Sequence, residues 1–366
     1  MKLVPDNEMR ISLPLSLLLL LSVSGRCLAV DGIYVQADSL SYSEPVPVSG
    51  FFHDWHTPFH DGGKRALTYN YAEAGVTEGN WQLGVVARDD YTLRFNPDTA
   101  DLYYRIENHL DFPPGRQYAV DLEARHFIAR GLRIGYGRQL RPAFRLGLGL
   151  TWLQGTQLLD GTMNGAAVAN DSRDYDYDVA VDYRYSKDLL FKRQASPPNG
   201  QGFSLDLSAD WHPGRLDASL RITDLVGRLY WHDAPYTQAD AVSLNKSYDA
   251  DGYLIINPTL SGIEGNRSFV QRLPTRARLD LRYPLHPALD LLAQVHYTQI
   301  RTFAAVGMGY SLPVGGRVGM LYDWDTGAVT LGFQAAHLKF SLSSDRIKWR
   351  SAHTLGASLE LRYDLK

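Results

Sequence analysis

Residues 203–225 read FSLDLSADWHPGRLDASLRITDL, and this stretch decides the fold class because it has the pattern of a complete β-hairpin. In the first arm, Phe203 to Trp211, apolar residues at odd positions alternate with Ser and Asp at even positions, which is the period of a β-strand. The segment His212-Pro213-Gly214-Arg215 breaks the strand, and its glycine permits the positive φ of a tight turn. The second arm, Leu216 to Thr223, repeats the alternation. One face of the hairpin therefore suits hydrocarbon and the other suits water.

The same alternation returns in three other stretches, at residues 144–152, 277–285 and 355–365. Alternation by itself does not distinguish a soluble β-sandwich from a membrane barrel, because both bury one face of every strand. These strands run for about 9 to 11 residues, the length that a tilted strand needs to cross a bilayer, whereas soluble strands are usually about five or six residues long. Repetition and length therefore favour a membrane barrel.

The N-terminus has the pattern of an export signal. Lys2 and Arg10 precede an apolar run from Ile11 to Val23, and small residues near Ala29 suit cleavage after it, so residues 1–29 are interpreted as a signal peptide. Arg26 argues against a lipid anchor on Cys27, because a small residue is expected before such a cysteine. The mature chain then has no cysteine and no disulfide. No later run of about 18 apolar residues predicts a transmembrane helix.

The composition fits this interpretation. A mean hydropathy of -0.25 is expected of a barrel, since half of each strand faces lipid and half faces water. The 22 tyrosines and seven tryptophans suit aromatic girdles at the two membrane interfaces. A net charge of -3 and a pI near 6.4 argue against a nucleic-acid partner.

The predicted fold is all-β, a transmembrane antiparallel up-and-down β-barrel formed by residues 66–366. The 337 residues after the signal, at about 20 residues per strand and connection, make about 16 strands, with 14 to 18 as the accepted range. Residues 30–65 are expected to form a plug, a periplasmic extension or a first irregular strand, with free disorder as the alternative. We expect strands at residues 67–73, 80–88, 101–109, 117–127, 131–140, 144–152, 175–185, 203–211, 216–225 with an extension to 231, 275–283, 289–299, 302–312, 317–324, 328–335, 337–343 and 353–363.

Turns are expected at Ala129-Arg130-Gly131 and at two Gly-containing sites in residues 155–173, and residues 232–275 are expected to be irregular with a minor hairpin near residues 249–252. This scheme contains a conflict. Strict alternation from a periplasmic C-terminus puts residues 155–174 on the side where turns are short, so one strand has been missed or invented.

The signal peptide, the alternating strands and the closing Leu359-Glu360-Leu361-Arg362-Tyr363 together resemble Gram-negative outer-membrane β-barrel proteins, at the level of the class. The resemblance implies a bacterial outer-membrane location, contact with outer-membrane lipid and lipopolysaccharide, and an assembly machinery that reads a terminal aromatic residue. Tyr363 matches that residue in kind, although Asp364, Leu365 and Lys366 follow it. An envelope complex is a further partner to consider.

Charges of both signs occupy the polar face of the strands and are expected to line the lumen. They either select ions in a hydrated interior or pair across it and close it. The predicted lumen-lining residues are Arg145, Arg184, Asp206, Asp210, Asp217, Arg221, Arg278, Asp280, Arg282, Glu360 and Arg362.

Three other groups of residues are candidate sites. The segment with His53, His56 and His60 is either a transition-metal site or a polar loop or plug, and its role stays open. The acidic run at Asp171, Asp174, Asp176, Asp178 and Asp182 is either a divalent-cation site or a solvated strand end in which Asp178 and Asp182 pair with Arg184. Ser341, Ser343 and Ser344 lie near His337 and His353 in sequence, but no spacing defines a catalytic constellation.

The sequence therefore predicts no enzyme, metal or cofactor. Its predicted function is porin-like or gated passage of small solutes across the outer membrane. The alternatives are a closed barrel that acts as a structural anchor or assembly partner, and an outer-membrane lipid hydrolase.

Overall fold

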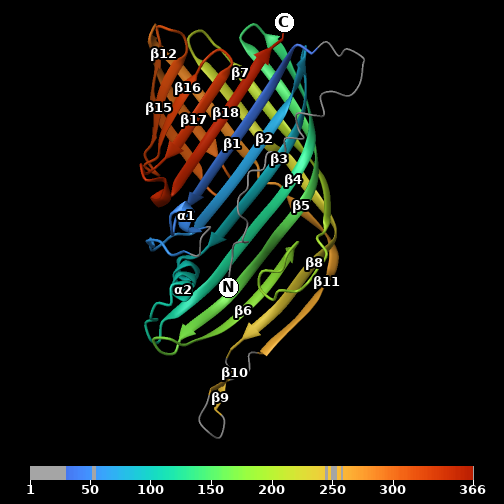
Figure 1. Ribbon diagram of the computed structural model, residues 1–366, viewed down its shortest axis with the longest axis vertical. Coiled ribbons are helices and arrows are strands. Elements are labelled where there is room, and N and C mark those ends of the chain that lie inside the picture. Colours follow the sequence, from blue (N-terminus) through green and yellow to red (C-terminus); the bar gives the residue numbers. More distant parts are fainter. Residues whose placement is uncertain (1–29, 52–54, 244–245, 249–253, 257–258, 366) are drawn as a thin grey trace.

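The computed structural model describes residues 30–51, 55–243, 246–248, 254–256 and 259–365, and its main sheet closes into a barrel (Figure 1). Neighbouring strands pair antiparallel around the ring, and β18 pairs with β1 to close it. The predicted fold class is therefore confirmed. Its strands are β1 (Gly32–Ser43), β2 (Arg65–Glu78), β3 (Trp81–Phe95), β4 (Gln117–Arg141), β5 (Phe144–Ala169), β6 (Tyr175–Tyr185), β7 (Asn199–Trp211), β8 (Asp217–Val242), β11 (Thr259–Arg272), β12 (Arg276–His286), β13 (Leu289–Tyr297), β14 (Thr302–Ser311), β15 (Arg317–Asp323), β16 (Val329–Gln334), β17 (Leu338–Ser344) and β18 (Thr354–Asp364).

Two positions in the ring are each occupied by two strands placed end to end. β5 pairs along its first half with β7 and along its second half with β6, and both of these strands also pair with β8. On the other side of β8, β11 and β12 are also placed end to end, but only β12 continues the ring to β13. The 16 strands of this sheet therefore make a ring of 14 positions, within the predicted range of 14 to 18.

The two ends of the barrel differ. At the end where β1 begins and β18 ends, here called the turn end, the strands are joined by connections of two to five residues. The opposite end, here called the loop end, carries the longer segments, which include α1 (Val48–Phe51), α2 (Pro97–Glu107), the hairpin of β9 (Lys246–Tyr248) and β10 (Leu254–Ile256), and the short helix η3 (Trp349–Ser351). None of the helices in the described ranges is long and apolar enough to cross a membrane.

A continuous apolar band surrounds the outside of the ring. Its side chains are the apolar members of the alternating strands, for example Leu132, Leu150, Met320 and Leu331, and all four are exposed. Exposed aromatic residues mark both edges of the band, as expected at the two interfaces of a membrane. They are Trp81, Trp211, Tyr283, Tyr310 and Tyr363 near the turn end, and Trp152, Tyr297, Tyr322 and Trp324 towards the loop end.

The wall is uneven in height. β4, β5 and β8 have 25 or 26 residues, whereas β15, β16 and β17 have six or seven, so one side of the barrel continues far beyond the other (Figure 1). On this tall side the outward residues Tyr91, Leu93 and Phe95 of β3 are buried, because Trp55 and Tyr103 of the loop-end segments pack on them. Loop-end chain therefore covers the outer face of the wall above the apolar band.

The first third of the chain corrects several sequence expectations. The strand expected at residues 101–109 is wrong, because residues 101–107 belong to α2 and residues 108–109 form the turn after it. The turn expected at residues 129–131 is also wrong, because β4 runs through it without a break. Residues 155–169, expected as a loop, complete β5 and extend it to the loop end. These changes lower the strand count by two. The topological conflict is resolved further along the chain, because β6 and β7 share one ring position and together cross once, so the connection at residues 170–174 lies at the loop end.

Two longer segments are also corrected. Residues 232–275 are not irregular throughout, because β8 continues to Val242 and β11 pairs with it. The plug expected over residues 30–65 is wrong for Gly32–Ser43, which form β1 in the barrel wall; the alternative of a first strand holds there. The minor hairpin is present as β9 and β10, with the expected tip residues 249–252 outside the described residues.

Candidate functional site in the barrel lumen

A cavity of about 220 Å³ lies inside the half of the barrel nearest the turn end. Inward glycines on β4 and β5 keep that part of the wall free of bulk. A Cβ at Gly149 would come within 2.2 Å of the Arg133 guanidinium, and a Cβ at Gly137 would come within 3.0 Å of Arg145. Glycine at these positions therefore lets two arginine side chains lie along the wall of the cavity.

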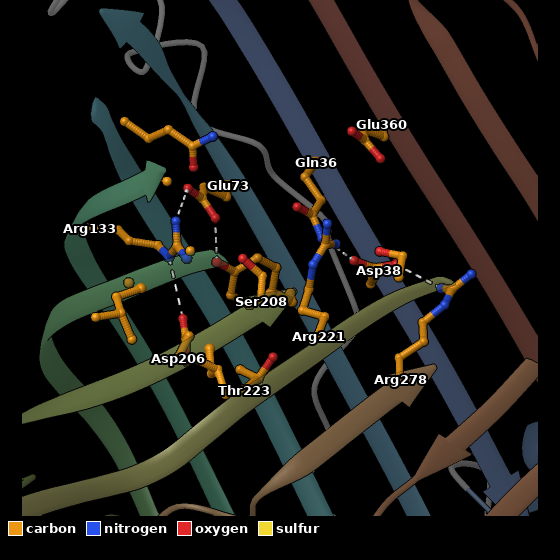
Figure 2. A pocket seen from close by; sticks show the side chains of 18 of the residues that line it. Gln36, Asp38, Glu73, Arg133, Asp206, Ser208, Arg221, Thr223, Arg278 and Glu360 are labelled. Carbon is orange, nitrogen blue, oxygen red and sulfur yellow. Dashed lines mark hydrogen bonds and ion pairs between the residues drawn. The ribbon is translucent and has the colours of Figure 1, made fainter. Parts of the chain in front are cut away.

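Arg133 organises one side of this cavity, as Figure 2 shows. Its guanidinium lies 3.5 Å from Glu73 on β2 and 3.3 Å from Asp206 on β7. The hydroxyls of Tyr34 and Tyr71 each donate to Glu73 at 2.5 Å. Both carboxylates are thus neutralised by hydrogen bonds and by one shared cation.

A second network crosses the lumen on the loop-end side of the first, and its side chains are almost fully buried. Arg88 on β3 donates to both carboxylate oxygens of Asp224 on β8, at 2.8 and 2.7 Å, and to Asp90 at 2.7 Å. Arg276 on β12 reaches Asp90 at 2.5 Å. Asp224 has a positive φ of 56° and sits where β8 bulges against β7, which turns its side chain inward.

Beyond this network an apolar cluster fills the same side of the lumen. Trp231, Leu229, Leu153 and Phe127 are buried there. Gly155 and Gly200 make room for the Trp231 ring, because a Cβ at either residue would lie within 2.6 Å of it. The lumen beside β3 to β8 is therefore closed by side chains.

The opposite side of the lumen contains a second cavity of about 70 Å³, towards the loop end. Hydroxyl-bearing residues of β16, β17 and β18 line much of it. Four residues line both cavities: Asp38, Tyr69, Arg278 and His296. These four residues, called the partition below, are the boundary between the two spaces.

The partition contains a long ion pair. Arg278 Nη1 lies 3.8 Å from Asp38, while its Nε lies 2.9 Å from Asp280 on the same strand. Gln36 donates to Asp38 at 2.7 Å. Each charge of the pair therefore keeps another polar partner if the two separate.

The structure places the predicted lumen residues as follows. Seven of them line the larger cavity: Arg145, Asp206, Asp210, Arg221, Arg278, Glu360 and Arg362. Asp217 and Arg282 pair with each other nearer the turn end, Asp280 pairs with Arg278, and Arg184 pairs with Asp182 in the tall part of the wall. Sequence reasoning missed Asp38, Glu73 and the Arg88 network, although Arg133 was within reach as the polar neighbour of Leu132 and Ile134.

The other candidate groups do not converge. His56 bonds to Asn108 at 2.9 Å, His60 stacks on His353 with ring centroids 4.6 Å apart, and His53 lies outside the described residues. Among the residues that the structure describes, no group of three or more His, Cys, Asp or Glu residues is placed to hold a metal ion.

The acidic run and the serines are also dispersed. Asp171 accepts two backbone N–H bonds in its turn, and Asp182 pairs with Arg184 at 3.0 Å. Ser341 bonds to Ser358, Ser343 to Thr330, and Ser344 to the carbonyl of Arg346. His353 instead contacts the Ser43 carbonyl, and His337 contacts the Tyr363 ring.

Comparison with known proteins gives structural matches only. No family model and no curated protein matches the chain. Solved structures that match it include a monoaromatic hydrocarbon channel, the TodX ΔS2S3 mutant, at 10% identity and a TM-score of 0.46, covering 92% of this chain and 91% of that one. The toluene transporter TodX of P. putida matches at 9% identity and a TM-score of 0.40, covering 92% and 89%. A Pseudomonas aeruginosa FadL homologue matches at 12% identity and a TM-score of 0.37, covering 92% and 90%.

The assignment to a class rests on the architecture of the chain itself. The ring is closed, so it leaves no unpaired strand edge to face hydrocarbon. Its outside carries an exposed apolar band with aromatic residues at both edges, and its inside carries charged residues. The chain is an outer-membrane β-barrel of the Gram-negative type.

Proposed function

We propose that this protein passes small polar solutes through its barrel across a bacterial outer membrane, with the turn end in the periplasm. The observation that carries the proposal is the pair of cavities inside a closed ring, which share the partition as their common boundary. A solute that moved from one cavity to the other would have to displace only side chains of the partition. The short turns and long loops fit the periplasmic and outer faces of such barrels.

The partition suits a gate because it opens at low cost. Separating Arg278 from Asp38 leaves Arg278 paired with Asp280 and leaves Asp38 with the hydrogen bond from Gln36, so neither side chain loses its last polar partner. Opening the Arg88 network would instead strip a buried guanidinium of a bidentate partner. The route for solute therefore runs on the β1, β12 and β18 side of the lumen.

Free cations give the larger cavity its charge preference. Arg145, Arg221 and Arg362 line it, and no described acidic residue lies within 4.0 Å of any of them. The carboxylates that line the same cavity already have polar partners. Glu73 and Asp206 pair with Arg133, and Asp38 pairs with Arg278. Asp210 accepts a hydrogen bond from Ser219, and Glu360 pairs with Lys339. The cavity should therefore attract anions more than cations.

Single-channel recording of the refolded chain in planar bilayers tests the proposal. Arg278→Ser removes the longest side chain of the partition and should raise the unit conductance several-fold over the unmodified protein. Arg282→Ser is the matched control, because Arg282 lies on the same strand but does not line both cavities. Absence of steady current steps from the unmodified protein and from the Arg278→Ser variant would overturn the proposal.

A closed barrel that anchors an envelope complex is the second candidate. It is favoured by the side chains that fill the lumen beside β3 to β8. The same recording separates the two functions, because a closed scaffold gives no conductance in either variant.

A further inference from the structure

The connection between β17 and β18 combines exposed apolar side chains with three cations. Residues Arg346 to Arg350 read RIKWR, and all five are exposed. Ile347 has a relative exposure of 105% and Trp349 of 60%, so the Ile347 side chain is fully exposed and the Trp349 ring is mostly exposed. An apolar pair left this open in a structured connection points to a surface that covers it.

The connection is held in place rather than loosely extended. The carboxylate of Asp345 accepts the backbone N–H groups of His353 and Thr354, both at 2.9 Å. Ser49 donates to the carbonyl of Arg350 at 2.6 Å, and the Val48 N–H donates to the carbonyl of Ala352 at 2.8 Å. The backbone is thus anchored at both ends, and the side chains of residues 346–350 are what it presents.

The connection starts at the outer edge of the membrane band. Ser344, the last residue of β17, pairs with Val329, and Val329 pairs with Tyr322 of the aromatic edge. Leu342, two residues earlier on the outward face, is 51% exposed and belongs to the apolar band. Figure 1 shows that this side of the barrel, with β16 and β17, is the short one. The wall therefore does not extend beyond the membrane band here, and the connection lies directly at its edge.

The chemistry of the five residues fits a phosphorylated lipid surface. Tryptophan favours the membrane interface, where its ring meets headgroups and acyl chains together. Guanidinium groups bind phosphate oxygens with two parallel hydrogen bonds, and basic residues beside a membrane are attracted to anionic headgroups. The Arg350 guanidinium lies 5.4 Å from the Trp349 ring, so an apolar and a cationic group are presented side by side.

We propose that residues Arg346 to Arg350 bind the phosphorylated headgroups of outer-leaflet lipid. Ile347 and Trp349 enter the interface, and Arg346, Lys348 and Arg350 contact the phosphates. This assigns a lipid-binding role to the short side of the barrel that is independent of solute passage. Asp345 is the nearby acid, and its carboxylate is occupied by the backbone bonds and lies 3.8 Å from Arg346.

The test uses the refolded full chain in neutral detergent, with bisphosphorylated lipid A as the probe and native mass spectrometry to count bound lipid. The unmodified protein should retain lipid A and bind its dephosphorylated form at least about tenfold more weakly. The triple variant Arg346→Gln, Lys348→Gln, Arg350→Gln should lose most of the bound lipid A. A matched control, Arg173→Gln, Lys187→Gln, Lys192→Gln, removes the same charge from exposed cations of the two connections that flank β6, and this variant should retain lipid A.

Two further arms decide the source and the mode of binding. Millimolar inorganic phosphate should not displace lipid A, since the apolar contacts need an acyl chain, and Ile347→Ser with Trp349→Ser should weaken binding without abolishing the preference for phosphate. The proposal is overturned if the triple variant binds like the unmodified protein, if the control loses as much lipid, or if free phosphate competes fully. All substituted side chains are exposed, so loss of folding does not confuse the result.

Discussion

Arg88 and Asp224 show what a single residue does in this lumen. Their bidentate contact is buried, with side-chain exposures of 2% and 0%. Removing one partner leaves the other charge in a low-dielectric site, which typically costs about 3 to 5 kcal/mol. Asp224→Ala should therefore lower the free energy of unfolding by about that amount, measured by denaturant titration of the refolded protein in detergent.

A double variant separates pairing from packing. In the Asp224→Ala variant, Arg88 and Arg276 share the single carboxylate of Asp90, which leaves one excess buried positive charge. Arg88→Met removes this charge and keeps most of the side-chain volume, so adding it should restore a substantial part of the lost stability. If the double variant is as unstable as the sum of the two single variants, the loss comes from the bulge of β8 and not from the ion pair.

His353 links stability to pH at the loop end. Burial lowers the pKa of its imidazole below the ordinary 6.5, against the opposing hydrogen bond to the Ser43 carbonyl. The unfolded chain therefore takes up a proton more readily than the folded chain does. As pH falls below about 6.5, the free energy of unfolding should decrease, and it should be recovered fully above that value.

Unfolding midpoints at pH 7.5 and pH 5.0 test this expectation. His353→Gln should show a smaller difference between the two midpoints than the unmodified protein. His286→Gln, at an exposed turn, is the control and should behave like the unmodified protein. Equal pH dependence in both variants would show that His353 is not the group responsible.

At the scale of the strand, the two faces of β7 should tolerate change very differently. Leu207 faces outward at mid-band, beside Leu148 of β5, and Ser208 lines the cavity. Leu207→Arg should cost about 2 to 4 kcal/mol because it places a charge in hydrocarbon, whereas Ser208→Arg should cost much less because its side chain stays in the polar lumen. Folding titrations into lipid vesicles measure both, and similar losses would contradict the assigned facing.

Asp206 shows how the structure changes an expectation drawn from facing alone. An inward carboxylate in a hydrated lumen should be replaceable at little cost. Asp206 is instead buried, and it accepts bonds from Ser204, from Arg133 and from the backbone N–H of Asp224. Substitution there removes three contacts, so the lumen side of a strand is tolerant only where water reaches it.

Alternation predicted the strands of the last third within a few residues, because there one face meets lipid and the other meets the lumen along the whole strand. It failed on β4, where Gly131 suggested a turn. Gly131 is needed for close strand packing, since a Cβ there would lie 2.2 Å from the Trp152 carbonyl oxygen. A glycine therefore indicates a turn only where no neighbouring atom occupies the space that a Cβ would fill.

The helix α2 did carry a readable signal. Asn96 caps it by accepting the N–H of Thr99 at 2.7 Å, and Pro97 occupies its first turn. Tyr103, which lies in the stretch expected as a strand, packs on the outside of the wall. Its burial depends on the uneven height of the barrel, which no local pattern encodes.

Part of the candidate site could be predicted from the sequence. Arg145, Arg221 and Arg362 stood out because each alternates with apolar neighbours in a regular strand. Asp38 and Arg88 did not, since Asp38 lies in a segment read as irregular and Arg88 at the end of a strand that was expected to stop there. Which charges pair across the lumen depends on ring closure, so the partition could not be predicted.

For the whole molecule, the charge of the larger cavity should set the preference of the permeating ion. Arg145, Arg221 and Arg362 are the cations without a described acidic partner, and an unpaired guanidinium in a narrow hydrated space attracts anions. Under a KCl gradient, the reversal potential of the unmodified protein should indicate preference for chloride. The triple change Arg145→Gln, Arg221→Gln, Arg362→Gln should shift it towards potassium.

The comparison that isolates this effect keeps the number of removed charges constant. Arg130, Arg228 and Arg272 are exposed cations on β4, β8 and β11, and none of them lines a cavity described here. Changing these three to Gln should leave the reversal potential where it is in the unmodified protein. A shift of the same size from both triple variants would mean that the overall charge of the barrel, and not the cavity, sets selectivity. Potassium preference in the unmodified protein would contradict the role given to the inward arginines.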